Sequence, residues 1–474
     1  MTELIKTDIC VIGAGPGGLS VAAAAAAFGV PVVLIEGGKP GGQSLNHRAV
    51  RSKALLAAAR RAEMLRRAAP FGVMAQRPAV DFAKVQDHIR SAVAAIAPGH
   101  SKERLTGLGV RVIEGAGRFK DTRTITVGAD TEIAARRFVI ATGSSPAIPP
   151  IPGLAETPYL TTETIFDLAR CPDHLIVIGA NSAGIELAQA FRQLGAEVTV
   201  LETARPLAED DPECVEAVLE QFLREGIAVR SGIPVLRVDS AGPKVRAVVQ
   251  CGSGEETIEG SHLLVAAGRS PNIDGLDLAA AGIKSEQGAI VVDESLRTSN
   301  RRVYAIGDVI GGAPSVHLAH HHAGRVIRSA LFRRTAKAET AVPRVTYTDP
   351  ELAHVGLTED EARKHHRDIR VLRSAYHEND RAQAERQTRG HIKVIAAKNG
   401  RILGATIVGA RAGELITTWT FAMRQGSNVQ AFAGLIVPYP TFAEIGKSAA
   451  LSYDLPSLTN PWVRRIIALL RRFG

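Results

Sequence analysis

The order of apolar runs and glycine-rich turns predicts a strand–helix–strand unit at the start of the chain. The apolar run at 9–12 is typical of a buried strand, and the alanine-rich stretch after the turn predicts a helix to Phe28. The apolar run at 31–35 predicts a second strand, which ends in the acid Glu36. This order of elements is a βαβ unit, in which the two strands are parallel.

The same order of elements returns farther along the chain. Residues 175–201 again predict a strand, a helix and a second strand, and the acid Glu202 follows. In each unit 23 positions separate the first glycine of the turn from the acid, Gly13 from Glu36 and Gly179 from Glu202. Two glycine-containing turns at matched spacing, each between a strand and a helix, indicate two dinucleotide-binding sites.

The first turn has glycine at each position that a dinucleotide-binding loop requires. Gly13 makes the tight turn, Gly15 lets the backbone approach a pyrophosphate, and Gly18 lets the helix pack on the strand. The helix then presents its unsatisfied N–H groups to phosphate. Glu36 is placed to accept hydrogen bonds from an adenosine ribose.

The second turn departs from this pattern at one position. Gly179 and Gly184 are present, but Asn181 stands where the middle glycine is expected. Asparagine tolerates a positive φ, yet its side chain intrudes, so we expect weaker binding or a shifted pose of the nucleotide. Glu202 would repel a 2′-phosphate and accept from a 2′-hydroxyl, which favours NADH over NADPH, whereas Arg205 nearby is a signal in the opposite direction.

The remaining pattern completes an α/β protein. Further strands are predicted at 138–141, 263–268 and 303–308, each beside a glycine-containing turn. After Pro343 the pattern predicts alternating strands and two helices without a nucleotide motif.

Composition and charge exclude several classes of protein. Of the 474 residues 45% are hydrophobic and 22% are charged, which excludes disordered, collagen-like and disulfide-scaffold chains. The net charge is +9, but four of those charges lie in residues 461–474, which contain no acid. A weak basic excess of this kind does not indicate a nucleic-acid partner.

The cysteines and histidines suggest neither a disulfide framework nor a metal site. Cys10, Cys171, Cys214 and Cys251 lie far apart and lack zinc-type spacing, which indicates free thiols in a reducing, cytoplasmic compartment. Charged residues at the start argue against a signal peptide. Three consecutive histidines, His320–His322, would point about 100° apart on a helix, so we expect no metal ion there.

These motifs resemble those of the flavin-dependent pyridine nucleotide–disulfide oxidoreductases, which include dihydrolipoamide dehydrogenase, mercuric reductase and soluble transhydrogenase. The resemblance covers about residues 5–452 and rests on GAGPGG at Gly13, ATG at Ala141, AIGD at Ala305 and YTDPELAHVGLTEDEA from Tyr347. It implies two Rossmann-like domains, one for FAD and one for NAD, and an α+β dimerisation domain of a homodimer. We place the domains at 1–150 with 272–340 (FAD), 151–271 (NAD) and 341–455 (dimerisation), with a basic tail at 456–474.

The resemblance also implies site residues. Asp308 would bind the ribityl chain of FAD, and Lys53 would pair with Glu186 beside the flavin N5, where hydride arrives. Tyr439 and Glu444 complete the catalytic set. The residues implied for FAD are Gly13, Gly15, Gly18, Glu36, Gly42, Ser44, Lys53, Gly117, Thr142, Gly143, Asp308 and Ala319, and those for NAD are Gly179, Asn181, Gly184, Glu202 and Gly268.

The chain departs from the family where the redox disulfide lies. The family segment usually reads GGTCLNVGCIPSK, and here it reads GGQSLNHRAVRSK from Gly41 to Lys53. Ser44 and Ala49 replace the two cysteines, and neither can form a disulfide. The usual dithiol relay is therefore expected to be absent.

A second departure concerns the general base. The family's HPTxxE segment is here YPTFAE, so Tyr439 replaces the histidine ahead of Glu444. A phenol with a pKa near ~10 is a poor base at neutral pH but can donate a hydrogen bond or act as an acid. Alternatively, Tyr439 only packs at the dimer interface.

What remains is a flavin site without a thiol relay. We infer an FAD-dependent NAD(P)H oxidoreductase that passes hydride from NADH to flavin and then directly to a small non-disulfide acceptor such as a quinone. Transhydrogenation between nicotinamides and a non-catalytic redox-sensing flavoprotein are the alternatives. His47, Arg48 and Arg51 add positive charge to the segment. One hypothesis is that Arg48 or Arg51 holds an anionic acceptor. The alternative is that these charges are solvated or paired with acids.

The end of the chain predicts a basic amphipathic helix. Pro461 suits the first helical turn after an Asn460 cap. Apolar side chains between Trp462 and Phe473 fall on one arc of the helix, and four arginines fill much of the other. Such a helix is typical of peripheral membrane contact, and the alternative is docking on its own dimer. Residues 461–474 are too short to span a bilayer.

Overall fold

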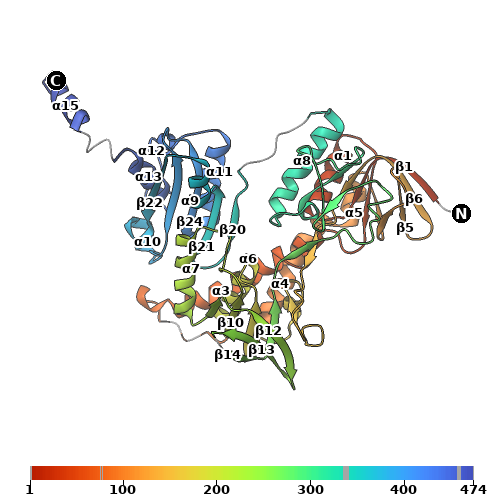
Figure 1. The fold of residues 1–474 in the computed structure, drawn as a ribbon, viewed down its shortest axis with the longest axis horizontal. Coiled ribbons are helices and arrows are strands. Elements are labelled where there is room, and N and C mark those ends of the chain that lie inside the picture. Colours follow the sequence, from red (N-terminus) through yellow and green to blue (C-terminus); the bar gives the residue numbers. More distant parts are fainter. Residues whose placement is uncertain are drawn as a thin grey trace. The chain divides into compact units, whose positions relative to one another are not determined.

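The computed structural model describes most of the chain, and Figure 1 shows its elements. The described residues are 3–74, 76, 78–252, 254–334, 341–455 and 461–472. The chain divides into two compact units. The first unit comprises Met1–Gly179, Gln193–Glu197 and Val235–Ala338, and the second comprises Ala180–Arg192, Val198–Pro234 and Glu339–Gly474.

A seven-stranded sheet forms the centre of the first unit. Its strands are β1 (Glu3–Ile12), β2 (Val32–Glu36), β3 (Val110–Glu114), β4 (Gly117–Phe119), β5 (Thr124–Val127), β6 (Thr131–Ile140) and β19 (Val303–Ala305). They run in the order β3-β2-β1-β6-β5-β4, and β19 pairs with β6. The central β1 is parallel to both β2 and β6.

Both faces of this sheet are buried, which explains the unbroken apolar runs of its strands. Successive residues of a strand point to opposite faces. Ile9 and Val11 pack with α1 (Pro16–Ala27) and α8 (Val316–Phe332), whereas Cys10 and Ile12 pack into a second cluster on the other face.

Smaller elements of the first unit surround this sheet. Its other helices are α2 (Gly42–Asn46), α3 (Ala49–Arg66), α4 (Phe82–Ile96) and α5 (Lys102–Gly107). β15 (His262–Val265) is parallel to β9 (His174–Ile178) and to β8 (Leu160–Thr161). The antiparallel pairs are β7 (Ser144–Pro146) with β16 (Arg269–Pro271), and β12 (Val235–Ala241) and β14 (Gly254–Gly260) with β13 (Lys244–Cys251).

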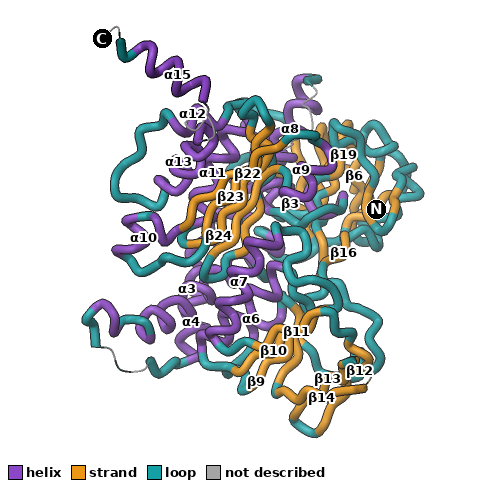
Figure 2. Tube along the Cα trace, turned by 60° about the vertical axis from the view of Figure 1, so that its left-hand side comes forward, coloured by secondary structure: helices purple, strands orange, loops and turns teal. Residues whose placement is uncertain are grey.

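The second unit combines a helix–strand segment with an antiparallel sheet. Its first part holds α6 (Ser182–Leu194), the parallel pair β10 (Glu197–Glu202) and β11 (Ala228–Ser231), and α7 (Pro212–Glu225). The antiparallel sheet has the order β20-β21-β24-β23-β22, and β22, β23 and β24 lie side by side in Figure 2. These strands are β20 (Arg344–Thr346), β21 (Glu351–Gly356), β22 (Ile369–Ala375), β23 (His391–Ala397) and β24 (Ile402–Gly409).

The helices after Pro343 correct one prediction. The pattern predicted two helices there, but the described residues 341–455 contain five, because short helices show too few turns for a clear periodicity. They are α9 (Glu359–His365), α10 (Asp380–Ala384), α11 (Ala412–Arg424), α12 (Val429–Ala433) and α13 (Glu444–Leu451). The two strand–helix–strand units are confirmed, and the domain boundaries stay a prediction.

A buried lysine organises charge in the second unit. Lys393 on β23 is only 4% exposed, and its ammonium lies 2.9 Å from Asp211, 3.0 Å from Glu213 and 2.8 Å from Glu359. Burial disfavours the charged lysine, but its hydrogen bonds to the three acids outweigh burial and raise its pKa. The hydrogen bond from Arg373 is the main reason that the pKa of Glu213 falls to about 2.

We predict that Lys393→Met lowers the free energy of unfolding by about 3–5 kcal/mol, because it leaves the buried Asp211 carboxylate without its cation. Urea unfolding measures this change. Lys244→Met is the matched control, since Lys244 pairs with Glu259 at the surface and such pairs contribute about 0–1 kcal/mol. Equal losses in the two variants would contradict a special contribution of Lys393.

The same cluster indicates how the stability of the fold changes when the pH is lowered. The pKa of Glu213 is lower in the folded protein, about 2, than its ordinary value of 4.5. The contribution of the Glu213 carboxylate to stability is therefore present above pH 4.5 and is lost as the pH falls from 4.5 towards 2.

Candidate active site

The first glycine turn forms an open phosphate loop. Gly13 has φ +101°, and a Cβ there would lie 2.5 Å from the Ala141 carbonyl oxygen. A Cβ at Gly18 would lie 1.9 Å from the Gly13 oxygen, so helix and strand pack too closely for a side chain. A Cβ at Gly15 would have nothing within 4 Å, and no side chain caps α1. The N–H groups at the start of α1 therefore face space that a pyrophosphate fits.

The acid after β2 is tied to this loop. The Ala14 N–H donates to Glu36 Oε2 at 2.5 Å, and the Gly38 N–H donates to Glu36 Oε1 at 2.7 Å. The carboxylate is thus fixed beside the turn, and each oxygen retains a lone pair for a ribose hydroxyl.

The segment that lacks both cysteines lies directly against the loop. A Cβ at Gly42 would lie 2.6 Å from the Gly15 Cα. The Ser44 hydroxyl donates to the Gly41 carbonyl oxygen at 3.2 Å, and Ala49 begins α3, which carries Lys53. The segment contains no sulfur, and all four cysteines of the chain are free.

The other residues implied for FAD lie around the same loop. The Thr142 hydroxyl donates to the Asn272 carbonyl oxygen at 2.7 Å. Asp308 accepts from the Ser144 hydroxyl at 2.7 Å and from the Ser315 N–H at 3.2 Å. The remaining positions fit this arrangement: Gly143 has φ +72° and open space, Gly117 lies in β4 against Ile35, and Ala319 lies against Gly307 and Gly17.

The site includes an arginine that the sequence motifs did not indicate. Arg269, directly after Gly268, has a buried side chain whose Nε donates to the Ser144 hydroxyl at 2.8 Å. Its Nη2 donates to the Ser144 carbonyl oxygen, to Glu163 and to Gln43. Its Nη1 is buried without a hydrogen-bond partner. The open glycine loop and this orphaned donor both fit a polar cofactor, and FAD is the one that the motifs imply.

Of the two alternatives for Arg51, the structure favours the one in which its charge pairs with an acid. The Arg51 guanidinium donates to Asp167 at 2.6 Å and to the Phe166 carbonyl oxygen at 3.1 Å, and it lies over the Phe166 ring. This arginine therefore serves an ion pair within the protein rather than an acceptor.

The second glycine turn repeats the geometry of the first. Gly179 has φ +106°, and a Cβ there would lie 2.4 Å from the Ala266 carbonyl oxygen. The Ala180 N–H donates to Glu202 Oε2 at 2.7 Å, and the Ala204 N–H donates to Glu202 Oε1 at 2.9 Å. These are the same two bonds, at the same spacing, that hold Glu36.

Asn181 makes the second turn different. Its side-chain oxygen accepts from the Ala183 N–H at 3.0 Å and from the Gly184 N–H at 3.1 Å. Asparagine is a favoured helix cap, and here it occupies N–H groups that a phosphate would otherwise use. The intrusion that the sequence predicted thus takes the form of a cap on α6.

Two further residues belong to the region expected to bind the nucleotide, and Arg205 bears on the choice between NADH and NADPH. Arg205 Nη2 donates to the carbonyl oxygens of Ala208 at 2.8 Å and Asp210 at 3.1 Å, so this guanidinium is engaged by its own loop. Gly268, with φ +120°, has open space around it.

The residues predicted for catalysis lie on separate elements. Lys53 lies on α3 of the first unit, and Glu186 lies on α6 of the second. Glu186 is buried, and its Oε1 accepts from the Tyr347 N–H at 2.9 Å. The pairing of Lys53 with Glu186 stays a prediction.

Tyr439 is exposed, and its phenol is held in the protonated form. Its hydroxyl donates to Asp380 at 2.7 Å, and this hydrogen bond raises the pKa of the phenol. Glu444, at the start of α13, accepts from the Thr441 N–H at 3.2 Å. The Asn379 amide also donates to the Thr441 carbonyl oxygen at 3.0 Å. The polar stretch 377–381 therefore contacts the YPTFAE segment.

The histidine run is divided among different partners. His320 Nδ1 lies 2.8 Å from the Ser20 hydroxyl, and His322 Nδ1 accepts from the Gly307 N–H at 3.3 Å. Among the described residues no group of three His, Cys, Asp or Glu side chains could hold a metal ion.

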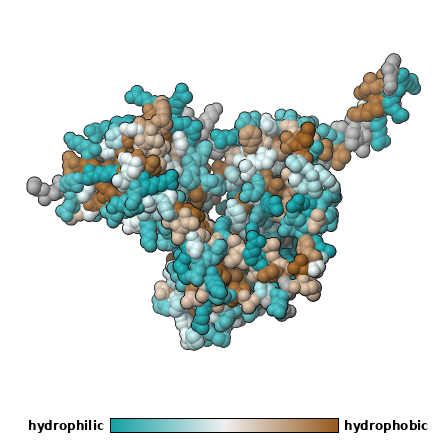
Figure 3. Space-filling view, turned by 180° about the vertical axis from the view of Figure 1, so that it is seen from behind, coloured by the Kyte–Doolittle hydropathy of each residue, from teal (hydrophilic) through white to brown (hydrophobic). Residues whose placement is uncertain are grey.

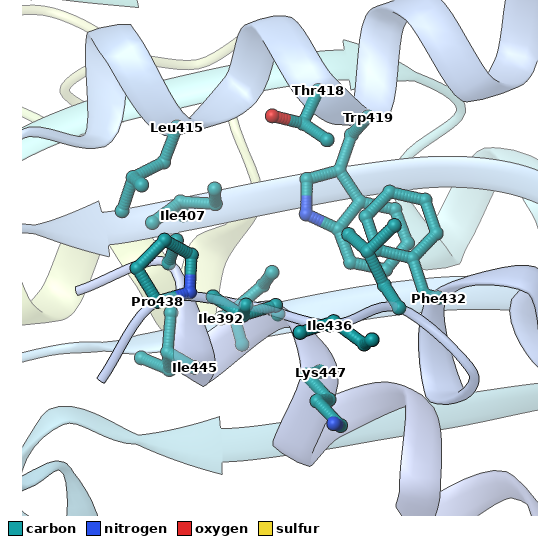
Figure 4. A pocket seen from close by; sticks show the side chains of 14 residues that line it. Ile392, Ile407, Leu415, Thr418, Trp419, Phe432, Ile436, Pro438, Ile445 and Lys447 are labelled. Atoms are coloured by element: carbon teal, nitrogen blue, oxygen red, sulfur yellow. The ribbon is translucent and has the colours of Figure 1, made fainter. Parts of the chain in front are cut away.

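A cavity of about 170 Å³ lies in the second unit (Figure 4). Its wall includes Trp419, which stacks on Phe432 at 3.9 Å, and Ile436 and Pro438 from the segment before Tyr439. The lining is apolar except for Thr418 and Lys447, so it offers little chemistry of its own.

Comparison with known proteins supports a family for this architecture. The model of the family described as pyridine nucleotide-disulphide oxidoreductase matches residues 7–323, and the dimerisation domain of the same family matches residues 342–450. Mercuric reductase of Shigella flexneri is 36% identical over 457 residues, covering 94% of this chain and 80% of that protein. Dihydrolipoyl dehydrogenase of Geobacillus stearothermophilus is 32% identical over 454 residues, covering 94% and 96%.

Solved structures agree with this result. The HOCl-induced flavoprotein disulfide reductase RclA of Escherichia coli superposes with a TM-score of 0.83 at 25% identity, covering 96% of this chain and 100% of that one. LpdA of Mycobacterium tuberculosis gives a TM-score of 0.86 at 27% identity, covering 94% and 99%. The two Rossmann-like domains and the α+β dimerisation domain expected from the sequence are those of this family.

We predict opposite effects for two substitutions of Asn181. Asn181→Gly frees the Ala183 and Gly184 N–H groups for phosphate and should lower the dissociation constant of NADH about three- to tenfold. Asn181→Asp retains the cap but adds a negative charge, and should weaken binding. Titration of each variant with NADH, followed by ligand fluorescence, measures both constants. Unchanged affinity in Asn181→Gly would contradict competition between the cap and the phosphate.

Proposed function

The chain belongs to the pyridine nucleotide-disulphide oxidoreductase family, and on that premise we propose that it is an FAD-dependent NAD(P)H oxidoreductase whose electron acceptor is not a disulfide. The observation that carries this proposal is the segment from Gly41 to Lys53, which lies against the FAD loop but holds Ser44 and Ala49 in place of two cysteines. The dimerisation domain indicates a homodimer.

The residues of the chain bind and orient, and they need no thiol for this. When bound, FAD supplies the hydride chemistry. The open turn at Gly15 and the fixed Glu36 hold one dinucleotide, and the turn at Gly179 with Glu202 holds the other. Lys53 and Glu186 are the groups proposed beside the reacting atoms. Ala49 leaves room where the family carries a sulfur atom.

A small oxidant such as a quinone suits this arrangement, because it can accept a hydride directly when stacked and oriented. Transhydrogenation between nicotinamides is the nearest alternative, and NADH with an NADP analogue tests it. The alternative of a non-catalytic redox sensor is less consistent with the two dinucleotide turns. In both turns the acid, Glu36 or Glu202, accepts its two backbone hydrogen bonds.

NADH is the proposed donor. Glu202 holds a carboxylate beside the second turn, and this charge would repel a 2′-phosphate. Arg205, which would favour NADPH, donates instead to Ala208 and Asp210.

We predict that anaerobic addition of NADH bleaches the flavin absorbance at about one equivalent, without a long-wavelength thiolate-to-flavin band. NADPH should need a higher concentration. The variant Cys171→Ser/Cys251→Ser, which removes the two cysteines that are not fully buried, should turn over a quinone at the wild-type rate. Loss of turnover in this variant would show that a thiol takes part, and no bleaching by either nucleotide would favour the non-catalytic alternative.

We also propose that the tail contacts an anionic membrane surface. The helix α15 (Pro461–Leu470) has no buried residue, and Trp462, Ile466, Ile467, Leu469 and Leu470 are each about half exposed or more. One flank of this helix is apolar and the other polar (Figure 3). The four arginines between 464 and 472 occur without an acid, and Arg465 lies over the Trp462 ring. Phe473 and Asn460, which the sequence analysis also used, lie outside the described residues.

The arrangement of charge and apolar surface supports a bilayer surface as the partner, since basic residues with Trp and Leu bind anionic interfaces. In the part of the chain that the structure describes, no helix has the length and apolar character needed to cross a membrane. The matched family domains end at residue 450, so the tail lies outside them.

We predict that the full chain sediments with vesicles containing phosphatidylglycerol but not with phosphatidylcholine vesicles, because the arginines need an anionic surface. Deletion of residues 461–474 should abolish sedimentation, as should Ile466→Asp/Leu470→Asp. Arg328→Gln is the control, because it removes a positive charge elsewhere and should leave sedimentation unchanged. If the deletion changes the oligomeric state instead of vesicle binding, the tail docks on its own dimer.

A further inference from the structure

Two arginines of the first unit lie beside each other on neighbouring strands. Arg137 lies on β6, and Arg302 directly precedes β19. The strands are parallel with Val303 opposite Phe138, and the Phe138 N–H donates to the Arg302 carbonyl oxygen at 2.9 Å, so the pairing extends to Arg302. Both arginines lie at the amino end of this paired segment. The phosphate loop at Gly13 follows the carboxyl end of β1, so the arginines lie apart from the dinucleotide turn.

Both side chains belong to the face of the sheet that α1 and α8 cover. Successive residues of a strand point to opposite faces, so Arg137 shares the face of Val139, and Arg302 shares that of Tyr304. Val139 and Tyr304 are buried in one cluster with side chains of α1 and α8, which lie side by side in Figure 1. The two arginines themselves are half-buried.

Arg297 joins this pair through a buried tyrosine. It forms an isolated bridge with Tyr304, and its Nε donates to the Tyr304 hydroxyl at 3.1 Å. Its Nη2 donates to the Ser329 hydroxyl of α8 at 3.2 Å, and the guanidinium lies 5.5 Å from the centre of the Tyr304 ring. These contacts fix the guanidinium but use only two of its five N–H donors. Arg137, Arg297 and Arg302 are called the basic cluster below.

Acids do not neutralise the basic cluster within the part of the chain that the structure describes. Asp8 pairs with Arg136 at 2.7 Å, and Asp293 accepts from backbone N–H groups of its own turn. The Arg137 guanidinium donates to the Arg136 carbonyl oxygen at 3.1 Å. Partial burial lowers the pKa of Arg137, and the charges of the neighbouring arginines lower it further. Like charges held together in this way repel one another.

We infer that the basic cluster binds the phosphate group of a small soluble anion. Phosphate esters carry a charge of about −1.5 to −2 at neutral pH and offer three acceptor oxygens. Guanidinium groups match phosphate oxygens in geometry and charge. An anion among the three guanidiniums therefore removes their repulsion and uses the donors that Arg297 leaves available.

The test is the thermal unfolding of the full-length, FAD-saturated protein in inorganic phosphate and in sodium chloride of equal ionic strength and pH. Phosphate should raise the melting temperature more than chloride does, because it binds the folded state. Arg137→Gln and Arg302→Gln should each raise the apparent dissociation constant for phosphate about tenfold or more, since each removes a charge-assisted hydrogen bond.

Arg136→Gln is the matched control. Arg136 precedes Arg137 on β6, so its side chain belongs to the opposite face of the sheet, and it pairs there with Asp8. This variant removes the same charge, yet its dissociation constant for phosphate should stay within about twofold of the wild type. In low salt without phosphate, Arg137→Gln should melt no lower than Arg136→Gln, because it relieves repulsion rather than breaking an ion pair.

Equal melting temperatures of the wild type in phosphate and in chloride would overturn this inference. So would an equal response to phosphate in the wild type and in both cluster variants, because the anion would then bind elsewhere, for example at the second glycine turn. The chain without residues 461–474 should not sediment with phosphatidic acid vesicles. Sedimentation that requires Arg137 and Arg302, without a response to inorganic phosphate, would assign the phosphate to a lipid and overturn the inference of a soluble ligand.

Discussion

The structure depends on a hydrogen bond between a backbone N–H and a carboxylate, made twice. Ala14 donates to Glu36, and Ala180 donates to Glu202. Each bond ties the turn after one strand to the end of the next, and this fixes the start of the intervening helix. Because the geometry is the same, the spacing in sequence is the same. Gly18 can then pack tightly, and Gly15 can remain open.

The fold was largely predictable because its signals are local. The parallel strands are apolar on both faces, and the glycines stand where a Cβ would collide with backbone. The short helices after Pro343 were not predictable in number, because five to eight residues carry too little periodicity. The intrusion of Asn181 was predicted, but its bonds as a helix cap depend on side-chain orientation that a sequence does not specify.

The ionic contacts mark the limit of sequence reasoning. Arg51 lies within the segment from Gly41 to Lys53 and Arg269 bonds to it, yet one pairs with Asp167 and the other retains an unpaired donor. Their partners lie more than a hundred positions away in the sequence, so no local pattern distinguishes them. The buried Lys393 was missed because Asp211 and Glu213, two of its three acids, lie equally far away in the sequence.

The serine hydroxyl bonded to Gly41 has a consequence for chemical durability. A thiolate beside a flavin can be oxidised stepwise to sulfenic, sulfinic and sulfonic acids, and the last steps are irreversible. Neither Ser44 nor Ala49 can undergo these reactions. Peroxide and hypochlorous acid, which inactivate enzymes through their redox thiols, find no sulfur in this segment. Ser44 and Ala49 thus leave this segment without the atoms that oxidants attack most readily.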